Sequence, residues 1–217
     1  MQRGLFDDLP YDATARRRLA PGAFWLVGFA RGLEAELHHA VAAVAAMAPF
    51  RAMATPGGRP MSVTTTCCGA VGWVSDRHGY RYAPCDPTTG APWPPMPPVF
   101  ADLAARAAAA AGHGAFAPDA CLVNRYAPGA RMGLHQDVDE RDFAQPIVSV
   151  SLGLPAVFRF GGVQRGDAAR RVPLASGDVV VWGGPSRRFF HGVLPVADGL
   201  HPRFGRCRIN LTFRVAR

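Results

Sequence analysis

The chain has 217 residues, a length that suits one domain with a full hydrophobic core. Nearly half of the residues are hydrophobic and 18% are charged, which is typical of a globular protein and excludes a disordered or fibrous one. The formal net charge is +8, and all 24 basic residues are arginine. Excess positive charge favours a polyanionic partner, although a proteome-wide bias towards arginine would give the same composition.

The N-terminus and the cysteines indicate a reducing compartment. No apolar run is long enough to span a bilayer, and residues 1–8 lack the apolar core of a signal peptide. We therefore expect a cytoplasmic protein without a membrane partner. The five cysteines are odd in number, two are adjacent and none forms a Cys-x-x-Cys motif, so we expect them to be reduced and mostly buried.

The N-terminal part of the chain predicts one helix and a long irregular segment. Residues 1–20 are polar and arginine-rich without periodicity, which predicts a flexible tail. A strand is expected over Phe24–Phe29, an amphipathic helix over Arg31–Met47 and an extended segment over Met61–Cys67. Residues 69–98 are dominated by glycine, proline and aromatic residues, too irregular for a regular sheet, and predict a substrate lid.

The C-terminal part predicts a helix followed by many short strands. Pro97 and Pro98 indicate the start of a helix that ends near Ala111, before Gly112. Eight strands are then expected, over Cys121–Tyr126, Gly133–Val138, Ile147–Leu152, Ala156–Phe160, Arg171–Leu174, Asp178–Trp182, Arg188–Val193 and Arg206–Val215. Short strands separated by glycine- and proline-containing turns are typical of a sandwich or jelly-roll barrel.

These elements together predict an α+β protein with a double-stranded β-helix (jelly-roll) core. After the tail of residues 1–20, a single domain is expected over residues 21–217. Its helix and irregular lid occupy residues 21–94, and the jelly roll occupies residues 95–217.

His135 and Asp137 form a His-x-Asp pair, a candidate for binding one metal ion. Residues two apart on a strand project from the same face, so the imidazole and the carboxylate can meet the same ion. Such a pair is weak by itself, because many surface strands contain one by chance. Of the other six histidines, His191 alone lies in a β-like run of the C-terminal part. A set of two histidines and one carboxylate leaves three metal positions open, the usual arrangement in non-haem Fe(II) oxygenases.

The last predicted strand has a polar face that contains Arg208, Asn210 and Arg214. Alternation with period two is typical of a half-exposed strand whose polar face is solvated. Two arginines with an asparagine between them also suit a dicarboxylate, because arginine binds a carboxylate bidentately. Asn124 and Tyr126, also two residues apart, can complete such a pocket. The dicarboxylate 2-oxoglutarate chelates the metal of such oxygenases and supplies electrons for dioxygen.

With these residues in place, the sequence resembles the AlkB-type Fe(II)/2-oxoglutarate-dependent dioxygenases, which repair alkylated DNA bases by oxidative demethylation. The resemblance extends over nearly the whole chain, from about Phe24 to Arg214. The matching segments are Thr55–Gly58, Met61–Val63, Gly72–Trp73, Gly79–Tyr80, Pro118–Gly129, Ile147–Gly153, Gly177–Gly184 and Asn210–Arg214.

The resemblance implies a catalytic centre in which His135, Asp137 and His191 bind Fe(II). Arg214 would hold one carboxylate of 2-oxoglutarate, and Arg208 would lie at the end of the cosubstrate nearer the metal. The side chains that would help Arg214 are Asn124, Tyr126 and Asn210.

The resemblance also implies a base-binding site between the lid and the metal. Trp73 would stack on one face of the extruded base and the metal-binding His-x-Asp histidine on the other, with Met61 and Tyr80 nearby. Asp139 would favour cationic lesions, and Arg165 would lie near the lesion. Without the resemblance, the lid aromatics would be interpreted as packing residues.

The implied function is oxidative demethylation of bases such as 1-methyladenine and 3-methylcytosine in DNA. Single strands would be favoured, RNA is a second candidate substrate, and the enzyme would be a monomer. The reaction would require Fe(II), consume O2 and 2-oxoglutarate, and release formaldehyde, succinate and CO2. One alternative is a 2-oxoglutarate dioxygenase that acts on tRNA, protein or lipid. Another is a non-catalytic basic module that binds nucleic acid without turnover.

Overall fold

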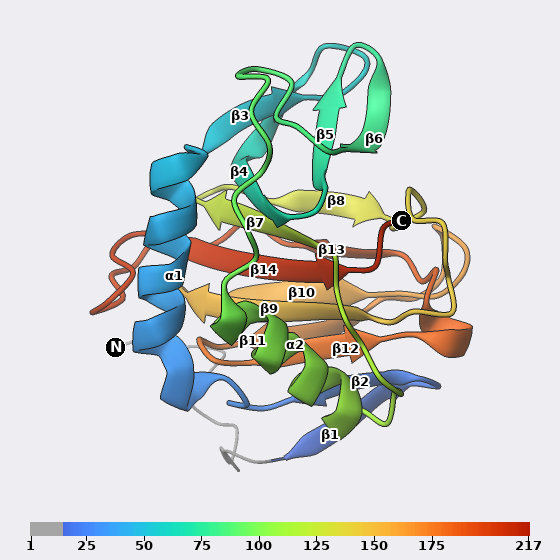
Figure 1. The fold of residues 1–217 in the computed structure, drawn as a ribbon. Coiled ribbons are helices and arrows are strands. Elements are labelled where there is room, and N and C mark those ends of the chain that lie inside the picture. Colours follow the sequence, from blue (N-terminus) through green and yellow to red (C-terminus); the bar gives the residue numbers. More distant parts are fainter. Residues whose placement is uncertain (1–14) are drawn as a thin grey trace.

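A computed structural model describes residues 15–217 of the chain, which form two β-sheets, two α-helices and a projecting hairpin (Figure 1). In spatial order, the large sheet comprises β1 (Arg16–Ala20), β2 (Ala23–Leu26), β12 (Val179–Trp182), β9 (Ile147–Gly153), β14 (Arg208–Arg214), β7 (Ala120–Tyr126), β4 (Pro60–Gly69) and β3 (Arg51–Ala54). The small sheet comprises β11 (Arg170–Leu174), β10 (Ala156–Phe160), β13 (His191–Val193) and β8 (Met132–His135). The hairpin comprises β5 (Gly72–Asp76) and β6 (Gly79–Ala83). This arrangement confirms the predicted jelly-roll α+β fold.

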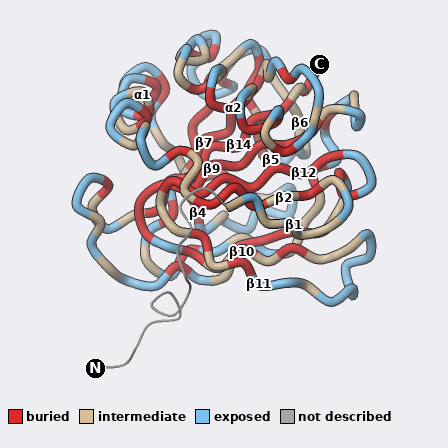
Figure 2. Tube along the Cα trace, turned by 90° about the horizontal axis from the view of Figure 1, so that it is seen from below, coloured by how far each residue is buried: buried red, intermediate tan, exposed pale blue. Residues whose placement is uncertain are grey.

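The large sheet is covered on both faces. Helices α1 (Glu34–Met47) and α2 (Pro98–Ala110) pack on one face, where the rings of Phe100 and Phe213 meet edge to face at 5.8 Å. The small sheet covers the other face, where Trp182 lies 6.1 Å from both Phe158 and Phe160. Central strands such as β9 and β14 are therefore buried along their whole length (Figure 2). Polar side chains on their inner face must find partners inside the protein.

The two predicted helices are confirmed. A short 3-10 helix, η1 (Arg31–Leu33), leads into α1, whose buried residues Leu37, Val41 and Val44 follow the predicted helical spacing. The second helix begins at Pro98 and ends at Ala110, one residue before the expected end. Both predictions succeeded because proline at a helix start and apolar residues on one face are local signals.

Two predictions for the N-terminal part were wrong. Residues 16–20, expected in the flexible tail, form β1, which pairs with β2, and the Arg16 guanidinium lies 3.8 Å from the ring centre of Phe24. The arginine-rich composition hid this strand, because its side chains pack through cation–π contacts and not through an apolar face. Residues 1–14 of the expected tail lie outside the described residues. The segment 69–98, expected to be irregular, contains the regular β5–β6 hairpin. Its strands pair without a bulge, with Gly72 opposite Ala83 at one end and Asp76 opposite Gly79 at the other.

Two further expectations concern the membrane and the cysteines. Within residues 15–217, no helix combines the length and apolarity needed to cross a bilayer. All five cysteines are free, and Cys67, Cys68 and Cys121 are fully buried, as expected. Burial raises the pKa of the Cys67 thiol to about 12, so it stays protonated.

Candidate active site

His135, Asp137 and His191 converge in the space between the two sheets. The ligand atoms that these three side chains offer lie within 4.8 Å of one another. Asp137 Oδ1 is 3.6 Å from Nε2 of His135, and Asp137 Oδ2 is 3.7 Å from Nε2 of His191. The two histidines face each other across the β8–β13 pair. The set therefore has the composition and proximity that suit an Fe(II) ion with open positions.

The backbone prepares both imidazoles for metal binding. Nδ1 of His135 lies 2.9 Å from the carbonyl oxygen of Gly133, and Nδ1 of His191 lies 3.0 Å from that of Phe189. A proton on Nδ1 donates to this carbonyl and leaves the Nε2 lone pair free for a metal. Burial lowers the pKa of His191 to about 4, so this ligand is neutral at physiological pH, as metal binding requires.

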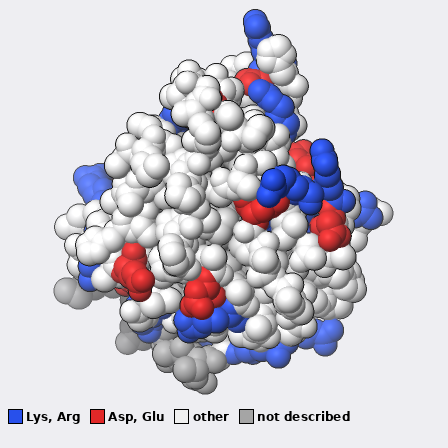
Figure 3. All heavy atoms as spheres, in the orientation of Figure 1, with Lys and Arg blue, Asp and Glu red and all other residues white. Residues whose placement is uncertain are grey.

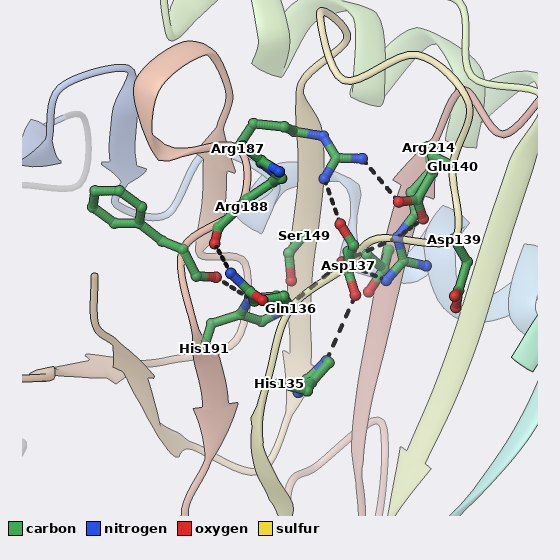
Figure 4. Close-up of polar contacts among 12 residues, drawn as sticks. His135, Gln136, Asp137, Asp139, Glu140, Ser149, Arg187, Arg188, His191 and Arg214 are labelled. Carbon is green, nitrogen blue, oxygen red and sulfur yellow. Dashed lines mark hydrogen bonds and ion pairs between the residues drawn. The ribbon is translucent and has the colours of Figure 1, made fainter. Parts of the chain in front are cut away.

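Asp137 occupies a loop, and the expectation that it continues the strand was wrong. Strand β8 ends at His135, and residues 136–146 have no regular secondary structure. Asp137 Oδ2 instead accepts hydrogen bonds from Nη2 and Nε of Arg214, at 2.8 and 3.1 Å (Figure 4). Burial alone would raise the pKa of the Asp137 carboxyl, but Arg214 and the two histidines hold that pKa well below its usual value.

Arg208 is a buried cation whose guanidinium has unpaired N–H groups. Its side chain is on the inner face of β14, and the residue is only 1% exposed. Nη2 donates to Ser151 Oγ at 3.0 Å, and the guanidinium lies 4.9 Å from the ring centre of Tyr126. Nε and Nη1 are buried without a hydrogen-bond partner. Two such N–H groups on one guanidinium fit a carboxylate, so the residues present fit one end of 2-oxoglutarate.

The polar face of β14 is thus buried, and the alternative interpretation of a solvated face was wrong. Asn210 lies opposite Asn124 in the β14–β7 register, and the Asn124 amide nitrogen donates to the Asn210 side-chain oxygen at 3.4 Å. The Asn124 side-chain oxygen is itself buried without a donor. The pocket therefore offers a bound molecule unpaired donors on Arg208 and an unpaired acceptor on Asn124.

The two arginines lie in the reverse of the expected order. Arg214 contacts the carboxylate of Asp137, whereas the contacts of Arg208 are with Ser151 and Tyr126. Six residues along a strand separate their Cα atoms by about 20 Å. The expectation that Arg208 lies nearer the metal was wrong, because the C-terminal end of β14, and not its start, approaches the loop of residues 136–146, called the metal loop from here on.

The lid faces the same cavity. The rings of Trp73 and Tyr80 stack, with centroids 5.5 Å apart and planes inclined by 13°. Trp73 Nε1 donates to Asp139 Oδ2 at 2.7 Å, which joins the lid to the metal loop. Arg165 Nη1 donates to the backbone oxygen of Leu134 at 2.7 Å.

A single cavity of about 730 Å³ connects all of these groups. Every residue that the sequence predicted to bind metal, cosubstrate or base lines it: Met61, Trp73, Tyr80, Asn124, Tyr126, His135, Asp137, Asp139, Arg165, His191, Arg208, Asn210 and Arg214. The structure therefore brings the whole predicted set together. The role of each residue within the set stays a prediction.

Sequence reasoning missed five residues that complete the site. Ser149 and Ser151 hydrogen-bond Asn210 and Arg208, and they alternate with apolar residues in β9, a period-two signal that could have identified them. The other three, Tyr82, Glu140 and Arg187, form buried contacts around the metal loop. No periodic pattern marks them, because their partners are distant in the sequence.

Comparison with known proteins agrees with this geometry. Residues 22–214 match the model of the 2OG-Fe(II) oxygenase superfamily. The chain is 55% identical over 205 residues to the alpha-ketoglutarate-dependent dioxygenase AlkB of Salmonella typhimurium, a match that covers 94% of this chain and 95% of that protein. The chain is an AlkB-type member of the 2OG-Fe(II) oxygenase superfamily. Its identity to the Escherichia coli AlkB is 56% over 198 residues, or 91% of this chain and 92% of the other.

Solved structures place the fold in the same family. The structure of OsALKBH1 superimposes with a TM-score of 0.82 at 30% identity, covering 92% of this chain and 99% of the other. An oxidoreductase of the 2OG-Fe(II) oxygenase family from Burkholderia pseudomallei has a TM-score of 0.57 at 18% identity, which shows the shared fold alone. The family resemblance inferred from the sequence is confirmed. Fe(II), O2 and 2-oxoglutarate are the metal and cosubstrates of this family, and the triad with the unpartnered Arg208 fits them.

Proposed function

We propose that the chain removes N-methyl groups from damaged nucleobases by oxidation, with lesions of the 1-methyladenine and 3-methylcytosine type as substrates. DNA, favoured as single strands, is the main substrate and RNA a second one. The single observation that supports this function is the shared cavity, in which the metal triad, the buried Arg208 and the aromatic lid face one another. Relatives support a nucleic-acid substrate: one that is 36% identical over 108 residues is the nucleic acid dioxygenase ALKBH1 of Mus musculus.

Each residue of the site is assigned a role from its position in the cavity. When bound, Fe(II) supplies the activation of dioxygen that is coupled to the oxidation of 2-oxoglutarate to succinate and CO2. His135, Asp137 and His191 hold the metal, Arg214 lies at the metal end of the cosubstrate pocket, and Arg208 binds the far carboxylate. Oxidation of the N-methyl group gives an N-hydroxymethyl base, which breaks down to formaldehyde and the unmodified base.

Substrate choice follows from the groups at the cavity mouth. A base inside a duplex cannot reach the metal, so the enzyme must extrude it or act on a single strand. Trp73 offers a flat π-face, and the hydrogen bond from its Nε1 holds the Asp139 carboxylate at the edge of the same ring. Because 1-methyladenine and 3-methylcytosine are cationic, both groups favour them over neutral bases.

The net positive charge contributes less to substrate recognition than the cavity does. On the face drawn in Figure 3, the arginines lie in small groups, several of them beside acidic side chains, and do not form one continuous patch. Recognition is therefore assigned to the cavity mouth, and the charge excess assists encounter with a polyanion.

The test is a competition assay with the protein reconstituted anaerobically with Fe(II) and 2-oxoglutarate. Formaldehyde release is measured from methylated single-stranded DNA, the same sequence as a duplex, and methylated tRNA. We expect the single strand to turn over fastest, and Asp137→Ala to abolish release. Absence of turnover on all three would overturn the proposal, and a preference for tRNA would favour the alternative substrate.

We further propose that the enzyme works as a monomer in the cytoplasm. Light scattering at working concentration should give the mass of one chain, and cell fractionation should recover the protein with soluble cytoplasmic markers.

A further inference from the structure

Arg187 holds the loop that contains a metal ligand. The loop of residues 136–146 has no regular secondary structure, so its shape depends on side-chain contacts. Arg187 follows the 3-10 helix η2 (Gly184–Ser186) and is only 3% exposed. Its Nη1 donates to the backbone oxygen of Asp137 at 2.9 Å, and its Nε to that of Gln145 at 3.0 Å. One guanidinium thus ties both ends of the loop to the segment that leads into His191.

Glu140 supplies the third contact and extends it to the lid. Its side chain is 2% exposed and accepts a hydrogen bond from Nη2 of Arg187 at 3.0 Å (Figure 4). The hydroxyl of Tyr82, on β6 of the lid hairpin, donates to the same carboxylate at 2.5 Å. Nε of Arg214 lies 3.2 Å from it. A single buried carboxylate therefore joins the metal loop, the cosubstrate strand and the lid.

The geometry distinguishes Arg187 from the residues that contact metal or cosubstrate. Arg187 meets the backbone of Asp137 and not its carboxylate, so it fixes where the ligand lies without replacing a ligand. Tyr82 donates as a neutral phenol, because burial, together with the Glu140 carboxylate, raises its pKa. Removing one partner of such a buried charged contact leaves the other uncompensated, so the three groups act as one unit.

We propose that Arg187 and Glu140 form a buried clamp that holds residues 136–146 in their metal-binding arrangement and links the metal site to the lid. Arg187 is a positioning residue: it sets the distance between Asp137 and His191. Glu140 makes the order of the lid depend on the same loop. By thermodynamic linkage, metal binding should order the lid, and a base bound under the lid should strengthen metal binding. The statement about the base rests on the proposed function, whereas the statement about the metal does not.

The test uses Mn(II) as the probe, so that no turnover is needed. Mn(II) affinity is measured by electron paramagnetic resonance titration for the full chain and for Arg187→Lys, which keeps the charge but loses the forked donor geometry. We expect the affinity to fall by about 10- to 100-fold, the usual effect of removing an outer-shell partner. The matched control is Arg188→Lys, an exposed neighbour whose guanidinium also approaches the Phe143 ring, and its affinity should not change.

A second readout follows the lid. Hydrogen exchange of β5–β6 should slow on addition of Mn(II) in the wild type and should respond less in Glu140→Gln, which keeps the shape of the side chain but not its charge. Saturating Mn(II) should restore lid protection in Arg187→Lys, because that substitution weakens metal binding without changing a ligand.

Two results would overturn the clamp. One is wild-type Mn(II) affinity in a folded Arg187→Lys protein. If that variant does not fold, Glu140→Gln decides: unchanged affinity together with an unchanged lid response removes the proposal. Loss of Mn(II) affinity in a protein that fails to demethylate any nucleic acid would leave the clamp standing and overturn only the proposed function.

Discussion

Arg208 offers a test in which stability and binding should change in opposite directions. Methionine in its place has a similar length and no charge, so Arg208→Met removes a cation that is 1% exposed and has two unpartnered N–H groups. Each such group costs about 1–3 kcal/mol, and the charged hydrogen bond to Ser151 returns about 1.5–3 kcal/mol. After lost packing against Tyr126, a net gain of roughly 1–2 kcal/mol remains. The unfolding midpoint of the cosubstrate-free protein should rise by about 2–8 °C.

Binding of 2-oxoglutarate to the same variant should weaken. Truncating one partner of a buried, hydrogen-bonded charge pair costs about 2–5 kcal/mol, which raises the Kd by about 30-fold or more. Thermal unfolding and calorimetric titration of the Mn(II)-loaded protein measure the two effects. Arg206→Met is the control, because Arg206 is exposed and its partner Asp198 lies at the surface. A lower midpoint, or a Kd within threefold of wild type, would refute the reasoning.

Three further substitutions or conditions probe the rest of the site. In Gly192→Ala the added Cβ would lie 2.7 Å from the carbonyl oxygen of Met132 and 2.9 Å from that of the next residue, so β13 must shift from β8. Mn(II) titration should show at least about a tenfold loss of affinity, and wild-type affinity would contradict this. Asp139→Asn keeps an acceptor for the Trp73 N–H but removes the charge, so competition between cationic and neutral methylated bases should shift against the cationic base by about fivefold or more. An equal loss for both bases would show that the charge has no role. In the metal-free protein, His191 has a pKa of about 4 against an ordinary 6.5, so the unfolded state binds its proton first as the pH falls. The contribution to the free energy of unfolding is complete above pH 6.5 and should fall by up to about 3 kcal/mol by pH 4, and denaturant titrations of His191→Gln should lack this component.

Local sequence patterns were enough to predict the two helices and the eight C-terminal strands, whereas the base-binding residues around the cavity were implied only by the family resemblance. Helical spacing in residues 34–47 and period-two alternation in Arg208–Arg214 each depend only on near neighbours. The metal triad was accessible because His135, Asp137 and His191 are residue types with a recognised joint chemistry. Strand boundaries were less accurate, since β8 ends two residues before Asp137.

Tertiary packing decided two points that the period-two pattern of β14 does not determine: whether its polar face is buried, and which of its arginines contacts Asp137. A period of two says which residues share a face, but not whether that face meets water or another sheet, so the polar face of β14 could be assigned to the interior only once the small sheet was seen to cover it. The direction of β14 towards the metal loop likewise decided that Arg214, and not Arg208, contacts Asp137.

The buried contacts of Arg187 and Glu140 have the same origin. Arg187 binds residues 42 and 50 positions away, and Glu140 accepts from Tyr82, 58 positions away. No window along the sequence contains both partners of these contacts. They form because folding places η2, the metal loop and the lid hairpin against one another, and there the exclusion of water makes each charged group dependent on its partner.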